Sequence, residues 1–257
     1  GIPAVYGGRL SSVLDIQMKE GNNQNFQGEG GIGLISSRLT LEGPIVKGKS
    51  SFLVSGRRTY GFDLAQPFIR QTDFAGTNYF FYDLNAKMNY QFSQKDRIYL
   101  SGYFGRDVLT FAQPGRDFQF TLPYGNATAT LRWNHLFTEK LFFNLSAIYN
   151  DYQFKAGFEQ EEFNFDIFSG VRDFTAKFDF DYFPSNDHQV KTGIHATKHR
   201  LTPNIIRGSA GETEFENTAT AKYANEYAIY LQDDWKINPW FRVNLGLRGT
   251  LFQQIGP

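Results

Sequence analysis

The sequence predicts an all-β chain that crosses a membrane as part of an antiparallel β-barrel, and three observations lead to this class. Residues 174–182 read FTAKFDFDY, an alternation of apolar and polar side chains that is typical of a strand with one apolar and one polar face. Such segments run for about ten to fourteen residues, the length of a tilted membrane-crossing strand. Their connections alternate between short turns and long loops, as in outer-membrane barrels.

The composition agrees with this class and excludes several others. The 257 residues include 26 basic and 26 acidic side chains, so the chain lacks the basic surface that nucleic-acid binding requires. Aromatic residues make up 17% although mean hydropathy is −0.42, as expected when aromatic girdles face lipid and polar residues face a lumen. The absence of cysteine excludes disulfides and thiolate metal sites. A cytosolic all-β protein is the alternative, but its strands would be shorter.

The alternation predicts eleven strands in sequence, without a helix. The first two should meet at a tight turn at Ser36-Ser37. The predicted strands are residues 28–36, 37–43, 50–60, 79–92, 97–111, 126–137, 141–154, 171–183, 189–199, 222–236 and 241–253.

The lengths of the connections predict the orientation of the barrel. Short turns are expected at residues 46–49, 93–96, 138–140, 185–188 and 238–239, and long loops at 61–78, 112–125, 157–170 and 201–221. Outer-membrane barrels place short turns in the periplasm and long loops outside the cell. The three tryptophans, Trp133, Trp235 and Trp240, fall near the short turns, where an interfacial aromatic belt would lie. The longest outer loops, 61–78 and 201–221, are the expected positions of selectivity.

The alternation also assigns side chains to the two faces of the sheet. The lipid face is predicted to carry Leu84, Leu131, Phe178, Phe180 and Leu245. The lumen face is predicted to carry the candidate substrate-binding residues Arg57, Asp83, Lys87, Arg132, Lys177 and Asp179. Because both signs of charge are interspersed, these residues fit two roles: they hold a plug or solvate the wall, or some of them contact substrate.

Eleven strands cannot close a single-chain bacterial barrel, since such barrels have an even number of strands. An open strand edge in lipid would leave backbone groups unpaired at a cost of several kcal/mol each. No signal peptide is visible at the N-terminus. We therefore expect this sequence to be part of a longer precursor and about half of a large barrel, completed by further strands of the same gene product or by a second polypeptide.

Residues 3–22, PAVYGGRLSSVLDIQMKEGN, differ from the barrel pattern, and on physical grounds are a glycine-hinged strand suited to close packing. The stretch YGGRLSSVLDI resembles the closing strand of the plug domain in TonB-dependent outer-membrane receptors, particularly those of Bacteroidota. Residues 28–45 and 51–60 are similar to the first three barrel strands of that family, and residues 82–107 match it as well.

This resemblance implies a plug end at residues 1–20 and the N-terminal half of a barrel of twenty-two strands at residues 21–257. It places the protein in the bacterial cell outer membrane. It implies outer-membrane lipid as a partner, and an inner-membrane energising complex that acts through an N-terminal part not included in this sequence. A surface lipoprotein partner is also consistent with it, whereas nucleic acid is not expected.

The predicted function is a TonB-dependent receptor that imports a scarce nutrient, such as a metal chelate, a vitamin or a glycan, through a plugged barrel. A passive porin and a structural barrel subunit of a surface or secretion complex are the alternatives. No catalytic residues, metal or cofactor are expected. The sequence has no G-x-S-x-G motif, and His195 and His199 would lie about 13 Å apart along a strand, too far to share one metal ion.

Overall fold

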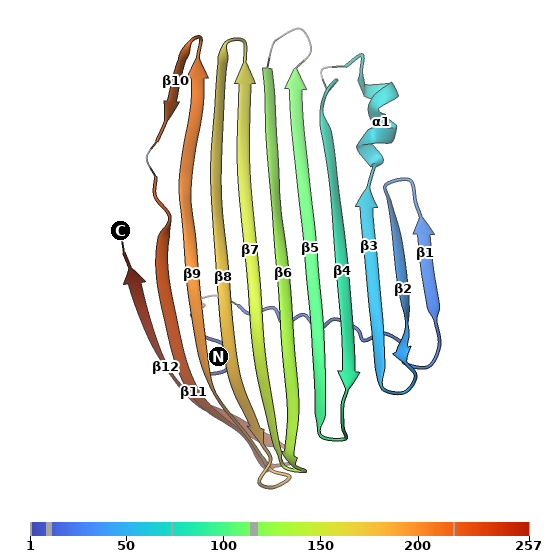
Figure 1. Cartoon of the computed structure of the whole chain (residues 1–257), viewed down its shortest axis with the longest axis vertical. Helices are drawn as coiled ribbons and strands as arrows, with labels where there is room; N and C mark the ends of the chain where they lie inside the picture. Colours follow the sequence, from blue (N-terminus) through green and yellow to red (C-terminus); the bar gives the residue numbers. More distant parts are fainter. Residues whose placement is uncertain (1, 9–11, 73, 114–117, 218, 257) are drawn as a thin grey trace.

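The computed structural model describes residues 2–8, 12–72, 74–113, 118–217 and 219–256. Within these residues twelve strands form one antiparallel sheet (Figure 1), in which eleven follow one another and β10 pairs only with β9. The strands are β1 (Gln27–Ile32), β2 (Ser36–Val46), β3 (Ser50–Thr59), β4 (Asn78–Gln91), β5 (Asp96–Gln113), β6 (Phe118–Thr138), β7 (Leu141–Gln160), β8 (Phe163–Tyr182), β9 (His188–Ala210), β10 (Thr213–Glu216), β11 (Lys222–Asn238) and β12 (Phe241–Ile255). The predicted all-β meander is confirmed.

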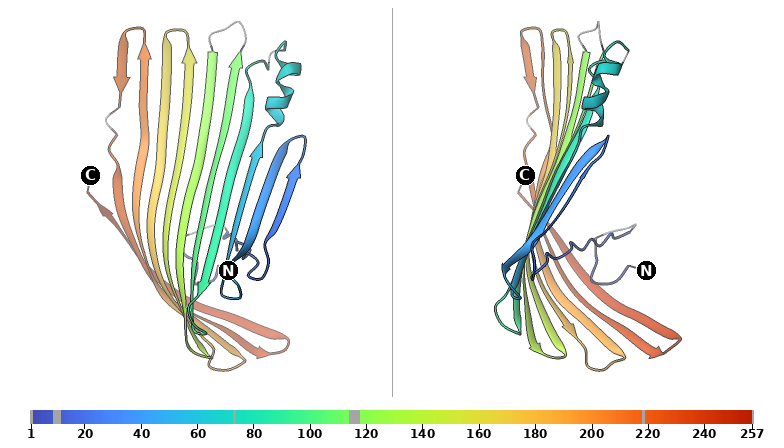
Figure 2. Two further views of the ribbon diagram at one scale, coloured as in Figure 1. Left: turned by 45° about the vertical axis from the view of Figure 1, so that its right-hand side comes forward. Right: turned by 90° about the vertical axis from the view of Figure 1, so that its right-hand side faces the viewer.

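The sheet is open, with β1 and β12 at its edges. Figure 2 shows it twisted and curved like a section of a barrel wall, with the N-terminal residues on one side only. We call that side the inner face and the opposite side the outer face. Sheets of this size twist because each strand has a right-handed twist of its own.

The register of the strands determines which residues share a face of the sheet, because paired residues on neighbouring strands point to the same side. Lys87 on β4 contacts the backbone of Met18 and so points inward. Its ladder partner Ser101 lies opposite Lys87 on β5, and the same row continues through β6 to β9 and Glu226 on β11 to Phe252 on β12. Neighbouring positions point the other way, because successive side chains alternate across a strand.

The outer face carries the apolar side chains, as the alternation predicts. Leu84, Leu131, Phe178 and Leu245 are all exposed on this face. Phe180 packs there against Phe143 of β7, with ring centroids 4.8 Å apart. Apolar side chains that remain exposed over a continuous sheet face are suited to contact with lipid.

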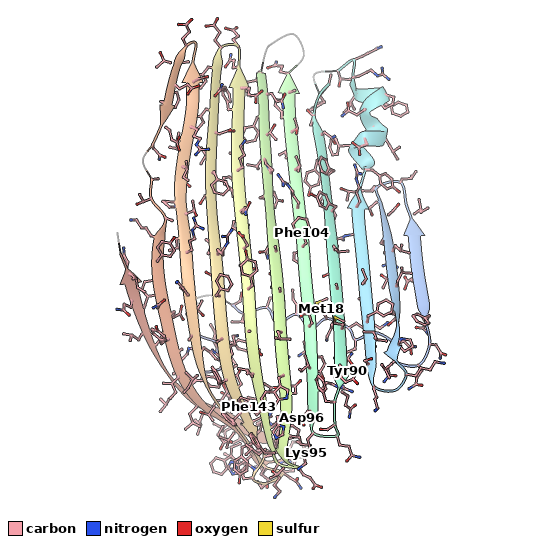
Figure 3. All side chains as sticks on the ribbon, in the orientation of Figure 1. Met18, Tyr90, Lys95, Asp96, Phe104 and Phe143 are labelled. Atoms are coloured by element: carbon pink, nitrogen blue, oxygen red, sulfur yellow. The ribbon has the colours of Figure 1, made fainter. Side chains whose placement is uncertain are left out.

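Aromatic side chains gather on the outer face near the short turns, together with the tryptophans. Trp133 donates to Asp96, the first residue of β5, and Trp235 stacks on His188. Trp240 is almost fully exposed between β11 and β12. Figure 3 places Asp96 and Phe143 at this lower end of the sheet, well below Phe104. The predicted position of the tryptophans is confirmed.

Three of the predicted long loops prove to be mainly strand. The strands β5 and β6 extend to Gln113 and from Phe118, so residues 112–125 are largely paired. The strands β7 and β8 are joined at residues 161–162, where Glu161 has a φ of 51°. Residues 201–210 continue β9, and 213–216 form β10. In the extensions of β6 and β8 the apolar residues change to the inner face, as Phe118, Phe120 and Phe163 do, so the alternation changes phase where the predicted strands end.

The predicted loop at residues 61–78 begins with a helix, α1 (Gly61–Ile69), which the sequence analysis missed. It is short and includes Pro67, which lacks the N–H of a helix-interior residue. Contacts with the start of β4 hold it, because Gln66 donates to the Thr77 carbonyl at 2.8 Å and Phe62 packs edge-on against Tyr79. Among the described residues, no helix is both long and apolar enough to cross a membrane.

The first hairpin also differs from the prediction. The turn between β1 and β2 lies at residues 33–35 rather than at Ser36-Ser37. Gly33 and Ser36 close it through a backbone hydrogen bond of 2.9 Å. The hydroxyl of Tyr60 also donates to the Gly33 carbonyl, so a contact from the end of β3 fixes the turn position.

Candidate functional site

The candidate site lies between the inner face of the sheet and residues 2–26, which we call the N-terminal segment. This segment crosses the inner face from β11 and β12 to β2 (Figures 1 and 2). Its described residues, 2–8 and 12–26, have no helix or strand. The expected plug strand at residues 6–16 therefore has no strand partner among the described residues, and residues 9–11 lie outside them.

Glu42 of β2 forms the first contact that fixes the segment to the wall. One carboxylate oxygen lies 2.9 Å from Lys19 Nζ, and the other accepts the backbone N–H of Asn22 at 2.9 Å. Glu42 is only 7% exposed, whereas Lys19 is largely exposed, so the bond from the Asn22 N–H is the better shielded of the two. Gly21 brings the segment against β3, since a Cβ at that position would overlap the Phe52 backbone.

Two neighbouring side chains of β4 extend this contact. Lys87 donates to the Met18 carbonyl at 2.9 Å and lies 3.2 Å from a carboxylate oxygen of Glu20. The Asn89 amide donates to the other oxygen of Glu20 at 3.0 Å and to Ser51 at 2.8 Å. We call Glu42, Lys87 and Asn89 the β2–β4 anchor. It combines ionic and backbone contacts on one short stretch of the segment.

The other end of the segment is held by β11 and β12. The Arg248 guanidinium donates to the carbonyls of Ala4 and Val5, at 3.2 Å each. The backbone N–H of Val5 donates to the side chain of Gln232 at 3.4 Å. We call Arg248 and Gln232 the β11–β12 anchor. Gly7 makes room for it, because a Cβ at Gly7 would overlap the Arg248 side chain.

A polar cavity of about 380 Å³ lies beside the β11–β12 anchor, between the segment and β8, β9, β11 and β12. Its wall contains charges of both signs, supplied by Asp173, Lys177, Glu226 and Arg248. His199 shares a hydrogen bond of 2.8 Å with Asp173 and lies 3.6 Å from Glu226. A larger hollow, of about 650 Å³, lies between the β4–β5 and β6–β7 turns, away from the segment.

A second histidine of this wall belongs to a compact network. His195 Nε2 and Asp179 share a hydrogen bond of 2.8 Å, and the hydroxyl of Tyr230 donates to the same carboxylate oxygen at 2.7 Å. Tyr230 and His195 are 3% and 8% exposed. A network with every member bonded rigidifies its surroundings, so it braces β8, β9 and β11 behind the cavity.

Tyr6 and Asp15 of the N-terminal segment also contact one another. The Tyr6 hydroxyl donates to an Asp15 carboxylate oxygen at 3.2 Å. Burial, and then the nearby Asp15 charge, raise the pKa of Tyr6 above its ordinary value. The phenol therefore remains a donor at neutral pH and links the two parts of the segment that border the cavity.

Three of the six predicted site residues form an ion pair between a lysine or arginine and a carboxylate. Arg57 and Asp83 form a cross-strand ion pair at 2.7 Å, and Arg57 also lies over the Phe81 ring. Lys87 belongs to the β2–β4 anchor. Their position on the inner face agrees with the sequence, and their contacts fit the role of holding the wall and the segment.

The other three predicted residues have different surroundings. Asp179 is bound by His195 and Tyr230. Lys177 lines the cavity, and Arg132 is exposed on the inner face. Among the described residues, neither Lys177 nor Arg132 lies within ion-pair distance of a carboxylate. These two cations are therefore the predicted residues with side chains available to a ligand.

His195 and His199 each bind their own carboxylate, Asp179 and Asp173. Within the described part of the chain, no group of three or more histidine and carboxylate side chains has the arrangement of a metal site. The spacing along β9 explains why His195 and His199 have separate partners, because residues four apart on a strand share a face but lie too far apart to bind the same ion.

Gln232 was not singled out in the sequence. Glu42 and Arg248 belong, with the predicted site residues, to the charged series that the alternation points inward, and holding a plug is one of the roles expected of that series. Their alternation places them on the inner face, but it carries no information about contacts with a distant segment. The glycines opposite them carry the usable signal. Gly7 and Gly21 lie where a Cβ would meet the wall, and glycine in an extended stretch indicates close approach of another part of the chain.

No protein-family model and no curated protein sequence matches the chain. Solved structures do match. They include BauA, the ferric preacinetobactin receptor from Acinetobacter baumannii, with a TM-score of 0.63 and 10% identity over 92% of this chain and 42% of that one. A mutant of the ferric enterobactin receptor PfeA from Pseudomonas aeruginosa matches with a TM-score of 0.57 and 13% identity over 90% and 40%. The ferric yersiniabactin uptake receptor FyuA from Yersinia pestis matches at 0.55 and 10% over 89% and 40%.

These neighbours are TonB-dependent siderophore receptors. The resemblance seen in the sequence is thus confirmed at the level of fold, and the chain has the strand arrangement of the barrel wall of these receptors. The chain spans about 40% of the length of these neighbours. They are receptors rather than enzymes.

Proposed function

We propose that the protein is an outer-membrane receptor and transporter, and that this chain is the end of its plug domain with the first half of its barrel. The observation that carries the proposal is the N-terminal segment, which crosses the inner face and is fixed at both sides of the sheet. A segment in this position occupies the lumen of a barrel. The fold shared with TonB-dependent receptors supports the same interpretation.

In this proposal, the cargo is a scarce nutrient such as a metal chelate, a vitamin or a glycan. The neighbours of known structure are receptors for ferric chelates, which makes a metal chelate the first cargo to test. The cavity beside the β11–β12 anchor is part of the proposed path, with Lys177 as a candidate contact. Energy would come from an inner-membrane TonB complex acting on the plug.

A porin is the second candidate, and the anchors argue against it. A passive channel needs an open lumen, whereas the charged contacts of Glu42 and Lys87 hold a segment across it. The third candidate, a structural barrel subunit with a lipoprotein partner, has no observation in its favour beyond the fold.

Single-channel recording of the complete gene product in a planar bilayer tests the proposal. We expect little or no steady conductance from the complete protein, because the plug closes the barrel. A variant lacking the plug domain, including residues 1–20, serves as the positive control and should form a large open pore. Equal, permanently open conductance of both proteins would contradict the proposal and favour the porin.

A further inference from the structure

A group of basic side chains borders the apolar surface of the outer face. Arg172 on β8 and Lys198 and Arg200 on β9 occupy neighbouring rows of the ladder, with Phe174 beside Lys198. Their alternation places them on the side that carries Phe178, opposite the N-terminal segment. We call Arg172, Lys198 and Arg200 the outer basic group.

Two of these cations directly oppose each other. Arg172 and Arg200 are ladder partners, and like charges in this position destabilise a sheet. Arg172 is bound on its other side by Asp151, at 2.7 Å. Among the described residues, no carboxylate lies within ion-pair distance of Arg200 or Lys198, so this part of the outer face has uncompensated positive charge.

The inner face offers a contrast. Arg38 and Arg57 are also ladder partners, but each has its own carboxylate, Glu29 for Arg38 and Asp83 for Arg57. There the protein itself neutralises the opposed pair. At Arg200 it does not, and an external anion would serve the same purpose.

An apolar furrow begins beside Lys198. Its floor is a row of small side chains on three adjacent strands, in which Ala176 is the ladder partner of both Ala147 and Ala196. Together with Lys198 and the flanking Tyr227, this row lines a groove of about 530 Å³. The remaining wall is made of large side chains, mainly Leu100, Leu131, Tyr149 and Phe174.

The geometry points to a lipid site: we propose that the outer basic group and the alanine furrow together bind a phosphate-bearing lipid of the outer leaflet. This inference rests on the proposed outer-membrane location. The acyl chain would lie in the furrow, and the phosphate would contact Lys198 and Arg200. Arginine and lysine form charge-assisted hydrogen bonds with phosphate, and a long basic side chain at an apolar boundary reaches toward head groups.

Charge favours a lipid over a second copy of the chain. Copies related by an axis along the membrane normal keep the same height, so a symmetric contact through this face would bring the two outer basic groups together. Juxtaposed like charges oppose association. An anionic head group above an acyl chain matches both the charge and the apolar furrow.

The test uses the complete protein in detergent, titrated with bis-phosphorylated lipid A and followed by native mass spectrometry of the adducts. The double variant K198Q/R200Q should weaken binding at least tenfold, because both charge-assisted bonds to the phosphate are lost. Arg106→Gln removes a basic side chain on the same face of β5, outside the furrow, and should leave binding unchanged.

A second pair of variants tests the furrow without changing charge. Ala176→Phe fills the floor and should weaken lipid A binding several-fold, whereas Ala86→Phe, on the outer face of β4, should not. Both variants must show the wild-type heat-modifiable band, which establishes that the barrel is folded.

Two further probes separate the possible ligands. Dephosphorylated lipid A should bind at least tenfold more weakly than the phosphorylated form, and inorganic phosphate should not displace it. Equal binding of both forms of lipid A, or unchanged binding by K198Q/R200Q and Ala176→Phe, would overturn the proposal. A dimer that K198Q/R200Q strengthens would overturn it as well and identify the face as a contact between copies. A blocked pore without lipid binding would leave the proposed transport function intact and reject this site alone.

Discussion

The two anchors of the N-terminal segment differ in the kind of contact they make. At the β2–β4 anchor, Glu42 and Lys87 each form an ion pair with the segment and each also bind its backbone. At the β11–β12 anchor, Arg248 reaches only neutral carbonyl oxygens, at 3.2 Å. Its Nε is buried and has no hydrogen-bond partner among the described residues.

This difference assigns unequal strengths to the two ends. Every one of these bonds has a charged member, but Glu42 and Lys87 also pair with opposite charges, whereas Arg248 meets only carbonyl dipoles at 3.2 Å. The β11–β12 anchor should therefore open first, and the polar cavity lies beside it. A plug that rearranges from this end would widen the cavity while remaining fixed to the wall at β2–β4.

The largest effect is expected for Glu42→Gln. The change removes the ion pair with Lys19 and weakens the bond from the Asn22 N–H, so residues 18–24 should be less stable against opening by about 2 kcal/mol. That loss corresponds to roughly thirtyfold faster amide exchange, measurable by hydrogen–deuterium exchange on the complete protein. Glu29→Gln, at an exposed carboxylate of β1, is the matched control and should have no effect on these residues.

A smaller effect is expected for Lys87→Met. Methionine keeps much of the side-chain volume but cannot donate to the Met18 carbonyl or pair with Glu20. Asn89 still binds Glu20, so the loss should be about 1.5 kcal/mol, or roughly tenfold faster exchange of residues 18–24. Lys155→Met, in the exposed ion pair with Asp166, is the control. If Lys87→Met left the exchange rates of residues 18–24 unchanged, the ionic contacts of Lys87 would not be what holds the segment at this anchor.

The part of the sheet with an apolar outer face could be predicted from the sequence because one physical rule governs it. Where one face of a strand meets an apolar surface and the other a polar one, as at Phe178 and Lys177, alternation records both. Above that level the alternation changes phase, because Phe118 and Phe120 lie on the inner face while Gln119 and Thr121 lie on the outer face, so the length of β6 was missed. The helix α1 was missed because contacts with β4 stabilise it rather than its own sequence.

The candidate site was predictable only in part, for a different reason. The alternation of side chains along each strand places Lys87 and Arg57 on the inner face, and the structure agrees. The alternation does not show that Lys87 binds the N-terminal segment while Arg57 binds Asp83. The partner of each side chain depends on the path of residues that are distant in sequence. Likewise, the outer basic group follows from the register of β8 against β9, which opposes Arg172 to Arg200 and cannot be derived from either strand alone.

The smallest effect, and the sharpest test of the comparison, is expected for Arg248→Met. No ion pair is broken, and the two bonds lost, to the carbonyls of Ala4 and Val5, are long at 3.2 Å each. The expected loss is about 1 kcal/mol, so exchange of residues 2–8 should become roughly fivefold faster. Residues 18–24 should keep their wild-type rates, because the β2–β4 anchor is intact. Arg242→Met, at an exposed inward position of the same strand, controls for the loss of charge. If Arg248→Met released residues 18–24 as well, the segment would open as one unit, and the two anchors would not differ in the way their contacts indicate.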